Sequence, residues 1–252
     1  MIADPFFYLA AVPAVVIVGL AKGGFVGLGI LGIPLIALVV PPMQAAAIML
    51  PILMVQDVVS IWAYRRHVDR RTLAVMLPGA LAGIVLGAAT AAIVSDAHVR
   101  LIVGIVALAF AANWWFGLSR QVAAHRPGGV ASGLFWGGVS SFTSFVSHAG
   151  GPPFQVHVLP LNLTRDTLVG TTAWFFAIVN LVKVAPYFWL GQFTCGNLLT
   201  AAVLFPAAVA STLAGVWVVR RIDGRRFYRI IYGLLALVGI KLVADGIGAL
   251  LP

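Results

Sequence analysis

The residues best suited to hold a polar ligand lie in the stretch 145–160, between two strongly apolar segments. This stretch contains His148, His157 and Gln155, and the run Gly-Gly-Pro-Pro at 150–153. A helix should not continue through that run, because proline lacks an amide hydrogen and glycine is permissive. Within a bilayer, broken backbone is tolerated only where protein buries it or where it lines a watery cavity. The stretch therefore predicts a binding site; the alternative is a kink that neighbouring helices satisfy.

A second break of the same kind spans 19–34, where Lys22 stands directly before two further glycines. The run Gly-x-Gly-x-x-Gly at 27–32 matches the dinucleotide-binding fingerprint. However, no strand pattern precedes it, and no acidic residue follows about 20 positions later. These glycines are better explained by close helix packing and by free amides that face a ligand. Two breaks whose helix N-termini converge would present hydrogen-bond donors to an anion.

Lys22 and His148 are expected at the tips of the two breaks, as a cation and a donor for a small anion. Five further residues complete the predicted anion site with backbone amides and one side-chain amide: Gly23, Gly24, Gly150, Gly151 and Gln155. For Lys22 the alternative is a side chain that reaches the membrane surface. For His148 it is an imidazole satisfied by backbone carbonyls, and His157 is expected to be structural.

A second polar set lies inside apolar segments and consists of Gln56, Asp57, Asn180 and Lys183. Asp57 and Lys183 hold equivalent places in the two halves of the chain, so we expect them to pair across a repeat axis. An ion pair that holds the bundle together is favoured over substrate contact. Gln56, Asn180 and Thr171 form the next candidate substrate site, although the Thr171 hydroxyl could equally bond the preceding turn.

Composition places these residues in a membrane. The chain has 252 residues, of which 62% are hydrophobic and 9% are charged. Several apolar runs approach the roughly 20 residues that span a bilayer as a helix. The net charge of +9 comes mostly from loop arginines, which fits orientation in a membrane better than binding of nucleic acid. The fold class is therefore an all-α polytopic membrane protein.

The chain divides into two halves that resemble each other. Lys22 and His148 are 126 positions apart, as are Pro34 and Pro160, and also Asp57 and Lys183. An ordered set of matches at one offset indicates internal duplication. We predict one membrane domain with a first repeat at 1–120 and a second at 127–252. The expected helical segments, about five in each repeat, are 5–21, 27–40, 43–64, 72–94, 99–118, 128–146, 153–162, 166–189, 197–219 and 227–250.

The distribution of arginine predicts the orientation. Loops 65–71, 119–127 and 220–229 are basic, whereas 186–197 carries no charge. Basic loops face the cytoplasm under the positive-inside rule, so 186–197 and both chain termini are expected to face outward. Loops 65–71 and 186–197 occupy equivalent places, so the repeats are predicted to be inverted. Each repeat then needs an odd number of crossings, and each break must act as a hairpin at the start of its repeat.

The run Ser-His-Ala-Gly-Gly-Pro-Pro-Phe-Gln at 147–155 and the glycine-rich break ending at Pro34 carry a family resemblance. On these residues, its length and its duplicated halves, the chain resembles the sulfite exporter TauE/SafE family, also called the 4-toluene sulfonate uptake permease family. Lys22 stands where that pattern favours small residues. The resemblance implies a multi-pass transporter of the bacterial inner membrane whose substrates are sulfite, sulfoacetate or related sulfonates.

The predicted function is secondary transport: export of a small sulfur-containing oxyanion, driven by the membrane potential or coupled to protons. The expected partners are the anion and the lipid bilayer, and a homodimer is left open. No cofactor and no enzymatic activity are expected. An anion channel or an importer are close alternatives. A membrane-embedded metalloenzyme with His148 and His157 as ligands is the alternative of a different class, although their spacing does not make a helical ligand pair.

Overall fold

The computed structural model describes residues 1–24, 28–93, 95–117, 129–218 and 224–250. The structure is 87% helix, and the described residues contain no strand. The first half contains α1 (Pro5–Lys22), the 3-10 turn η1 (Leu28–Leu31), α2 (Gly32–Ala37), α3 (Pro42–Tyr64), α4 (Arg70–Ile93) and α5 (Asp96–Phe116). The second half contains α7 (Val130–Ser147), α8 (Gly151–Val158), the 3-10 turn η2 (Leu159–Leu161), α9 (Arg165–Trp189), α10 (Cys195–Val218) and α11 (Gly224–Leu250).

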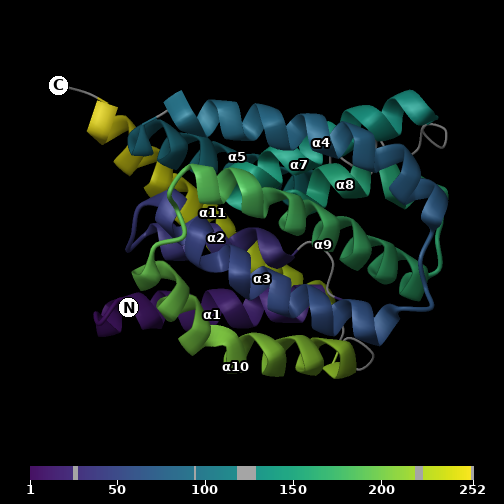
Figure 1. The fold of residues 1–252 in the computed structure, drawn as a ribbon, viewed down its shortest axis with the longest axis horizontal. Coiled ribbons are helices and arrows are strands. Elements are labelled where there is room, and N and C mark those ends of the chain that lie inside the picture. Colours follow the sequence, from purple (N-terminus) through teal and green to yellow (C-terminus); the bar gives the residue numbers. More distant parts are fainter. Residues whose placement is uncertain (25–27, 94, 118–128, 219–223, 251–252) are drawn as a thin grey trace.

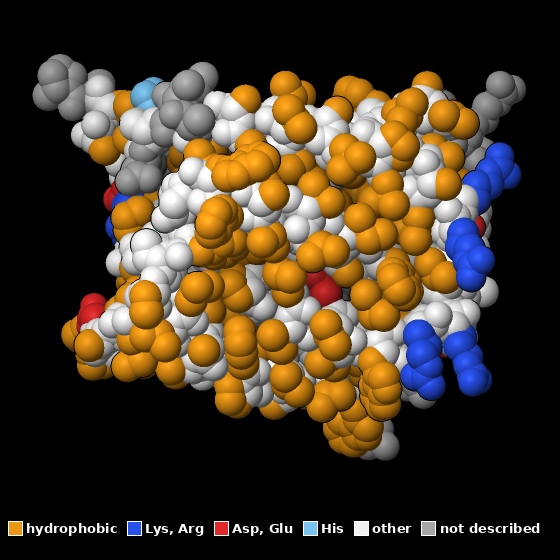
Figure 2. All heavy atoms as spheres, viewed as in Figure 1, with side chains coloured by type: hydrophobic (Ala, Val, Ile, Leu, Met, Phe, Trp, Pro, Cys, Tyr) orange, Lys and Arg blue, Asp and Glu red, His pale blue; other side chains and the backbone are white. Residues whose placement is uncertain are grey.

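The predicted all-helical membrane fold is confirmed. Six helices in the described part of the chain are long and apolar enough to cross a bilayer. Hydrophobic side chains cover a broad band of the surface, and most of the visible lysine and arginine gathers at one end (Figure 2). This distribution suits a multi-pass membrane protein, whose lipid-facing surface must be apolar.

Two predicted segments are each divided into a short α-helix and a 3-10 turn. Within 27–40 the structure forms only η1 and the six residues of α2. Within 153–162 it forms the end of α8 and the three residues of η2. Glycine and proline cluster in both segments, and each removes helix stability. As a result, each half has a long helix, a short broken piece and then three more long helices.

The helix contacts are symmetric in sequence order. α1 packs against α10, and its counterpart α7 packs against α4. α3 packs against α10, as α9 packs against α4, while α3 contacts α9 and α5 contacts α11. Exchanging the two halves therefore reproduces these main contacts between the long helices. Figure 1 also shows the α3–α4 and α9–α10 connections at opposite ends of the bundle.

Glycines let the two helices that precede the breaks approach their partners closely. A Cβ at Gly79 of α4 would lie 1.9 Å from the Leu134 carbonyl oxygen of α7. A Cβ at Gly23 would lie 2.5 Å from the backbone of Gly215 in α10. Such approach maximises van der Waals contact between helices in a bilayer, and it fixes the positions of the α1 and α7 ends where the site is built.

Candidate functional site

The first break begins where α1 ends at Lys22. The amides of Gly23 and Gly24 turn back and donate to carbonyls in the last turn of α1, at 2.9 and 3.1 Å. From α3, the Ser60 hydroxyl donates to the Lys22 carbonyl at 3.0 Å, and the Tyr64 hydroxyl donates to the Gly23 carbonyl at 2.8 Å. The free backbone groups at this helix end are therefore satisfied within the protein. Lys22 also gains from its position, because a helix C-terminus favours positive charge.

The Lys22 ammonium forms an ion pair with Asp57 of α3. The other carboxylate oxygen of Asp57 accepts a hydrogen bond from the Asn180 side-chain amide of α9 at 2.6 Å. Lys22 also lies over the Phe176 ring, 5.6 Å from its centroid. Asp57 is 2% exposed, so both of its oxygens are used in a buried setting. The charge of Lys22 is thus compensated by the carboxylate that holds it.

The second break begins where α7 ends at Ser147. His148 caps this helix with a left-handed backbone, at φ 49°, and its amide donates to the Ser144 carbonyl at 3.1 Å. The Ser140 hydroxyl then donates to the Gly150 carbonyl at 2.7 Å. Gly150 itself is tightly enclosed, because a Cβ there would lie 2.5 Å from the Ser140 carbonyl oxygen. The chain can restart as α8 only because this residue has no side chain.

Both ring nitrogens of His148 have partners within the protein. Nε2 lies 3.1 Å from the Ala46 carbonyl of α3, and Nδ1 lies 2.9 Å from the Ser144 carbonyl. The Lys183 ammonium of α9 lies 2.8 Å from Nδ1 and also donates to the Ser144 carbonyl and hydroxyl, at 3.0 and 3.1 Å. Lys183 is fully buried, at 0% exposed. His148 is thereby held in one orientation by three helices.

The predicted direct pair of Asp57 with Lys183 does not form in this structure. Asp57 bonds Lys22 and Asn180, while Lys183 bonds Ser144 and His148. The reason is geometric: contacts formed within each half replace the expected contact across the axis. Both pairs have the same spacing of 35 residues. Two contacts join the two halves here: the bond from Asn180 to Asp57 and the contact between His148 Nε2 and the Ala46 carbonyl.

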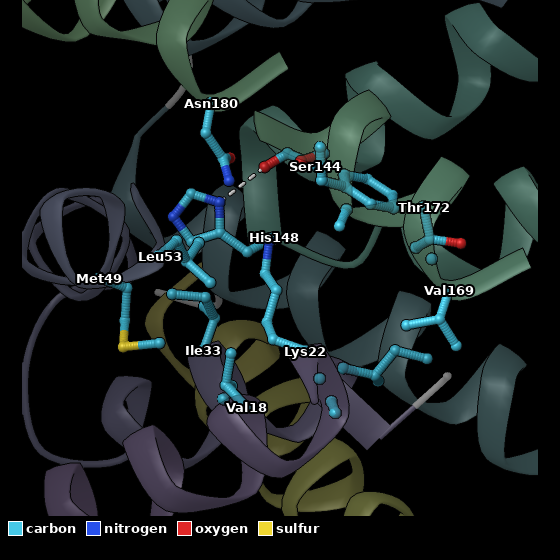
Figure 3. A pocket seen from close by; sticks show the side chains of 17 residues that line it. Val18, Lys22, Ile33, Met49, Leu53, Ser144, His148, Val169, Thr172 and Asn180 are labelled. Carbon is cyan, nitrogen blue, oxygen red and sulfur yellow. Dashed lines mark hydrogen bonds between the residues drawn. The ribbon is translucent and has the colours of Figure 1, made fainter. Parts of the chain in front are cut away.

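The two breaks border one cavity of about 90 Å³, large enough for several water molecules. Lys22, His148 and Asn180 contribute polar groups to its lining, together with Ser144 and Thr172 (Figure 3). The remaining wall is apolar and includes Val18, Ile30, Ile33, Met49, Leu53 and Phe176. A mostly apolar lining with a few charged and polar groups suits a small polar ligand of fixed orientation.

The cavity brings together only part of the predicted anion site. Lys22, His148, Gly151 and Asn180 line it. Gln155 lies outside the lining, but its side-chain nitrogen is buried with no protein partner. That nitrogen is 4.0 Å from the place where a Cβ of Gly151 would sit. A modest side-chain rotation would therefore bring an unused donor to the cavity edge.

Other predicted contributors serve the fold instead. The amides of Gly23 and Gly24 cap α1, so they do not face the cavity. Pro152 and Pro153 remove two amides from the start of α8, and of its first three residues only Gly151 has an N–H to offer. The predicted shell of converging backbone amides is therefore reduced to one end of one helix.

Two residues of the next candidate substrate site, Thr171 and Gln56, also have structural partners. The Thr171 hydroxyl accepts a hydrogen bond from the Asp69 amide at 2.8 Å, which fastens the α3–α4 connection to α9. The Gln56 amide donates to the Val15 carbonyl at 3.1 Å. Neither residue lines the cavity, whereas Thr172, the neighbour of Thr171, does.

Ser144 is the site residue that sequence reasoning missed. It lines the cavity and contacts both Lys183 and His148. Its position four residues before His148, one helical turn, was the available signal. His157 lies elsewhere, 3.1 Å from the Ser132 hydroxyl. Within the described ranges, no group of three or more His, Cys, Asp or Glu residues is placed to hold a metal ion.

One comparison with known proteins identifies a relationship. The family model described as Sulfite exporter TauE/SafE matches residues 11–242. That range covers both breaks and every residue that lines the cavity. No curated protein and no solved structure matches the chain significantly.

Proposed function

Because the chain belongs to the sulfite exporter TauE/SafE family, we propose that it exports a small sulfur-containing oxyanion, either sulfite or a short organosulfonate. The proposed location is the bacterial inner membrane. Transport is secondary, driven by ion gradients or the membrane potential, and the protein performs no chemical conversion of its substrate. The carrying observation is the cavity between the two breaks, whose lining includes the partly buried Lys22 and His148.

The proposed binding site is that cavity. An anion that leaves water needs charge and donors in return, yet its binding must remain weak enough for release. Lys22 supplies N–H groups beyond the one that Asp57 accepts, since an ammonium has three. Neutral donors come from the Gly151 amide, since Gly151 lines the cavity, and from the Gln155 side-chain amide beside it. Net positive charge comes from the cations around the cavity, which outnumber the single carboxylate of Asp57.

The proposed repeat relation explains how such a site opens to both sides. The symmetric helix contacts and the opposite placement of the α3–α4 and α9–α10 connections support two inverted repeats. In transporters of this design, one repeat rocks against the other around a fixed midplane site. The Lys22–Asp57 pair joins α1 to α3 within one half, and the Asn180–Asp57 bond joins the halves. We infer that the second bond is remade during the cycle.

The test is efflux of radiolabelled sulfite from liposomes that contain the purified protein. Wild-type protein is expected to release sulfite faster than protein-free liposomes, and Lys22→Met is expected to abolish the difference. Lys241→Met is the matched control, because Lys241 is an exposed lysine that pairs with Asp245 outside the cavity. Equal efflux from wild type and Lys22→Met would place the site elsewhere, and no efflux from wild type would remove sulfite as substrate.

A further inference from the structure

Lys183 and His148 share a hydrogen bond in a place where neither has a carboxylate partner. Their nitrogen atoms are 2.8 Å apart. Within the part of the chain that the structure describes, no carboxylate oxygen lies within 4.0 Å of the Lys183 nitrogen. Its other partners are the carbonyl and the hydroxyl of Ser144. A fully buried ammonium is here surrounded by neutral groups alone.

The short distance limits the charge that the pair can carry. In one arrangement the Lys183 ammonium donates to Nδ1 of a neutral His148, whose Nε2–H donates to the Ala46 carbonyl. In the other, a His148 imidazolium donates from Nδ1 and Lys183 is a neutral amine. If both were protonated, two N–H groups would point at each other across 2.8 Å. The pair therefore carries one positive charge or none.

The groups around the Lys183–His148 pair are balanced or occupied, so the charge that can change here is that of the pair itself. On the neighbouring helices these groups are Asp57 of α3 and Lys22 of α1, with Tyr187 on α9 itself. Lys22 and Asp57 form an ion pair whose charges cancel. The Tyr187 hydroxyl is occupied as a donor to the Phe145 carbonyl. The charged groups of α4, which also packs on α9, are Arg70 and Arg71 at its exposed end.

We propose that the Lys183–His148 pair takes up one proton when an anion enters the cavity and gives it back when the anion leaves. This rests on the proposed anion transport. His148 and Ser144 line the cavity and Lys183 lies directly behind them, so an anion there faces either a neutral or a singly positive pair. A dehydrated anion beside the neutral pair would be uncompensated, which is costly.

The step involves only one proton. It comes from water or buffer on the side to which the cavity is open, and one N–H bond forms on Lys183 or His148. Release of the anion reverses this, and no other bond changes. Because binding free energies are reciprocal, the proton must raise anion affinity as much as the anion raises proton affinity.

Substitutions in the pair can lock it in either charge state. Arginine stays protonated in proteins, so Lys183→Arg holds the pair positive at every pH. The double change Lys183→Met with His148→Gln removes both nitrogens that can take up the proton, so the pair stays neutral at every pH. Wild-type sulfite affinity should fall with rising pH by up to about tenfold per pH unit more than in either variant. The quantity to compare is the difference in pH dependence between wild type and variant. Sulfite itself also titrates, but it contributes the same pH dependence for every protein.

The measurement is sulfite binding by isothermal titration calorimetry on purified protein across the neutral pH range. Two buffers of different ionisation enthalpy count the protons taken up. Wild type should take up one more proton per sulfite than the double variant Lys183→Met with His148→Gln, and Lys241→Met should match wild type. If the double variant does not fold, Lys183→Arg alone serves as the comparison, since its charge is fixed.

The same pH dependence and proton count in wild type and in whichever variant folds would overturn the proton linkage. That outcome leaves the anion site intact. Absence of sulfite binding by wild type is a different result, because it overturns the proposed function first. The two failures are therefore distinguishable in one series of titrations.

Discussion

At the first break the partly buried Lys22 has a carboxylate as its partner, whereas beside the second break the fully buried Lys183 has only neutral acceptors. The architecture is otherwise parallel. In each half a lysine or histidine at the helix end bonds a residue 35 positions later on the next long helix. In each half a tyrosine of that long helix caps a carbonyl near the break, at 2.8 Å.

The difference teaches how one scaffold separates two tasks. Lys22 with Asp57 is an ion pair whose charges cancel, so it can hold position without excess charge. Lys183 with His148 has no carboxylate to balance a proton that the pair takes up. The compensated pair resists changes of pH and ligand, whereas the protonation of the uncompensated pair responds to both. We infer that the first break provides rigidity and the second provides attraction for the substrate.

Asp57→Asn gives the strongest test of the difference in charge compensation between the two breaks. This change keeps the shape of the side chain but leaves the Lys22 ammonium without its counter-charge, which costs about 3–5 kcal/mol when one partner of a buried pair is removed. His148→Gln at the second break removes a neutral acceptor only, so about 1–3 kcal/mol is expected. Thermal unfolding in detergent measures both. The double change Lys22→Met with Asp57→Asn should recover part of the loss, because no stranded charge remains.

A smaller effect is expected on anion binding. Lys22→Met removes a donor and also leaves Asp57, which lies behind Lys22 and Asn180 of the cavity lining, without its counter-charge. A loss of about 1.5–3 kcal/mol follows, which is about 10- to 150-fold in the dissociation constant for sulfite. The double change with Asp57→Asn should bind sulfite more tightly than Lys22→Met alone. If the double change binds no better, Asp57 has no influence on the anion and the first break is not a charge-compensated site.

The helical fold was largely predictable from the sequence, but the contacts among the charged residues of the site were not. Apolar run length and the glycine–proline clusters located the helices and both breaks, because those properties act locally. The offset of 126 residues predicts that Lys22 is equivalent to His148 and Asp57 to Lys183. Equivalence, however, does not imply contact. Which equivalent residues meet depends on how the long helices pack, and that packing depends on glycine contacts between segments distant in sequence.

The same packing explains why only some glycines of the breaks belong to the site. Gly23 and Gly150 were predicted as anion donors, yet each is pressed against backbone of another segment. Gly151 instead borders the cavity with open space beside it. In sequence the paired glycines are indistinguishable, because their roles depend on neighbours from distant parts of the chain.

Alanine substitutions of the second glycine pair separate packing from binding. Gly150→Ala should destabilise the protein by about 1–3 kcal/mol, since overpacking forces the backbone to shift. Gly151→Ala should leave the unfolding temperature near that of wild type, because its new methyl group meets only the Gln155 side chain. That methyl group projects toward the cavity, so sulfite efflux should fall. Equal stability losses for the two variants would mean that Gly151 is a packing residue as well.

The smallest perturbation tests whether the two breaks are related by inversion. Cys195 is the only cysteine, and it is exposed at the start of α10. A membrane-impermeant maleimide should label it in intact cells, because the uncharged 186–197 connection is predicted to face outward. Cys195→Ser with Arg66→Cys moves the probe to the exposed α3–α4 connection, where labelling should require permeabilised cells. Both substitutions lie on the surface, so stability should change by less than about 0.5 kcal/mol. Labelling of both positions from the same side would show that the equivalent connections are not on opposite faces. The two breaks would then be repeated in sequence but not inverted. The presence of a carboxylate partner at the first break alone would need an explanation other than access from opposite sides.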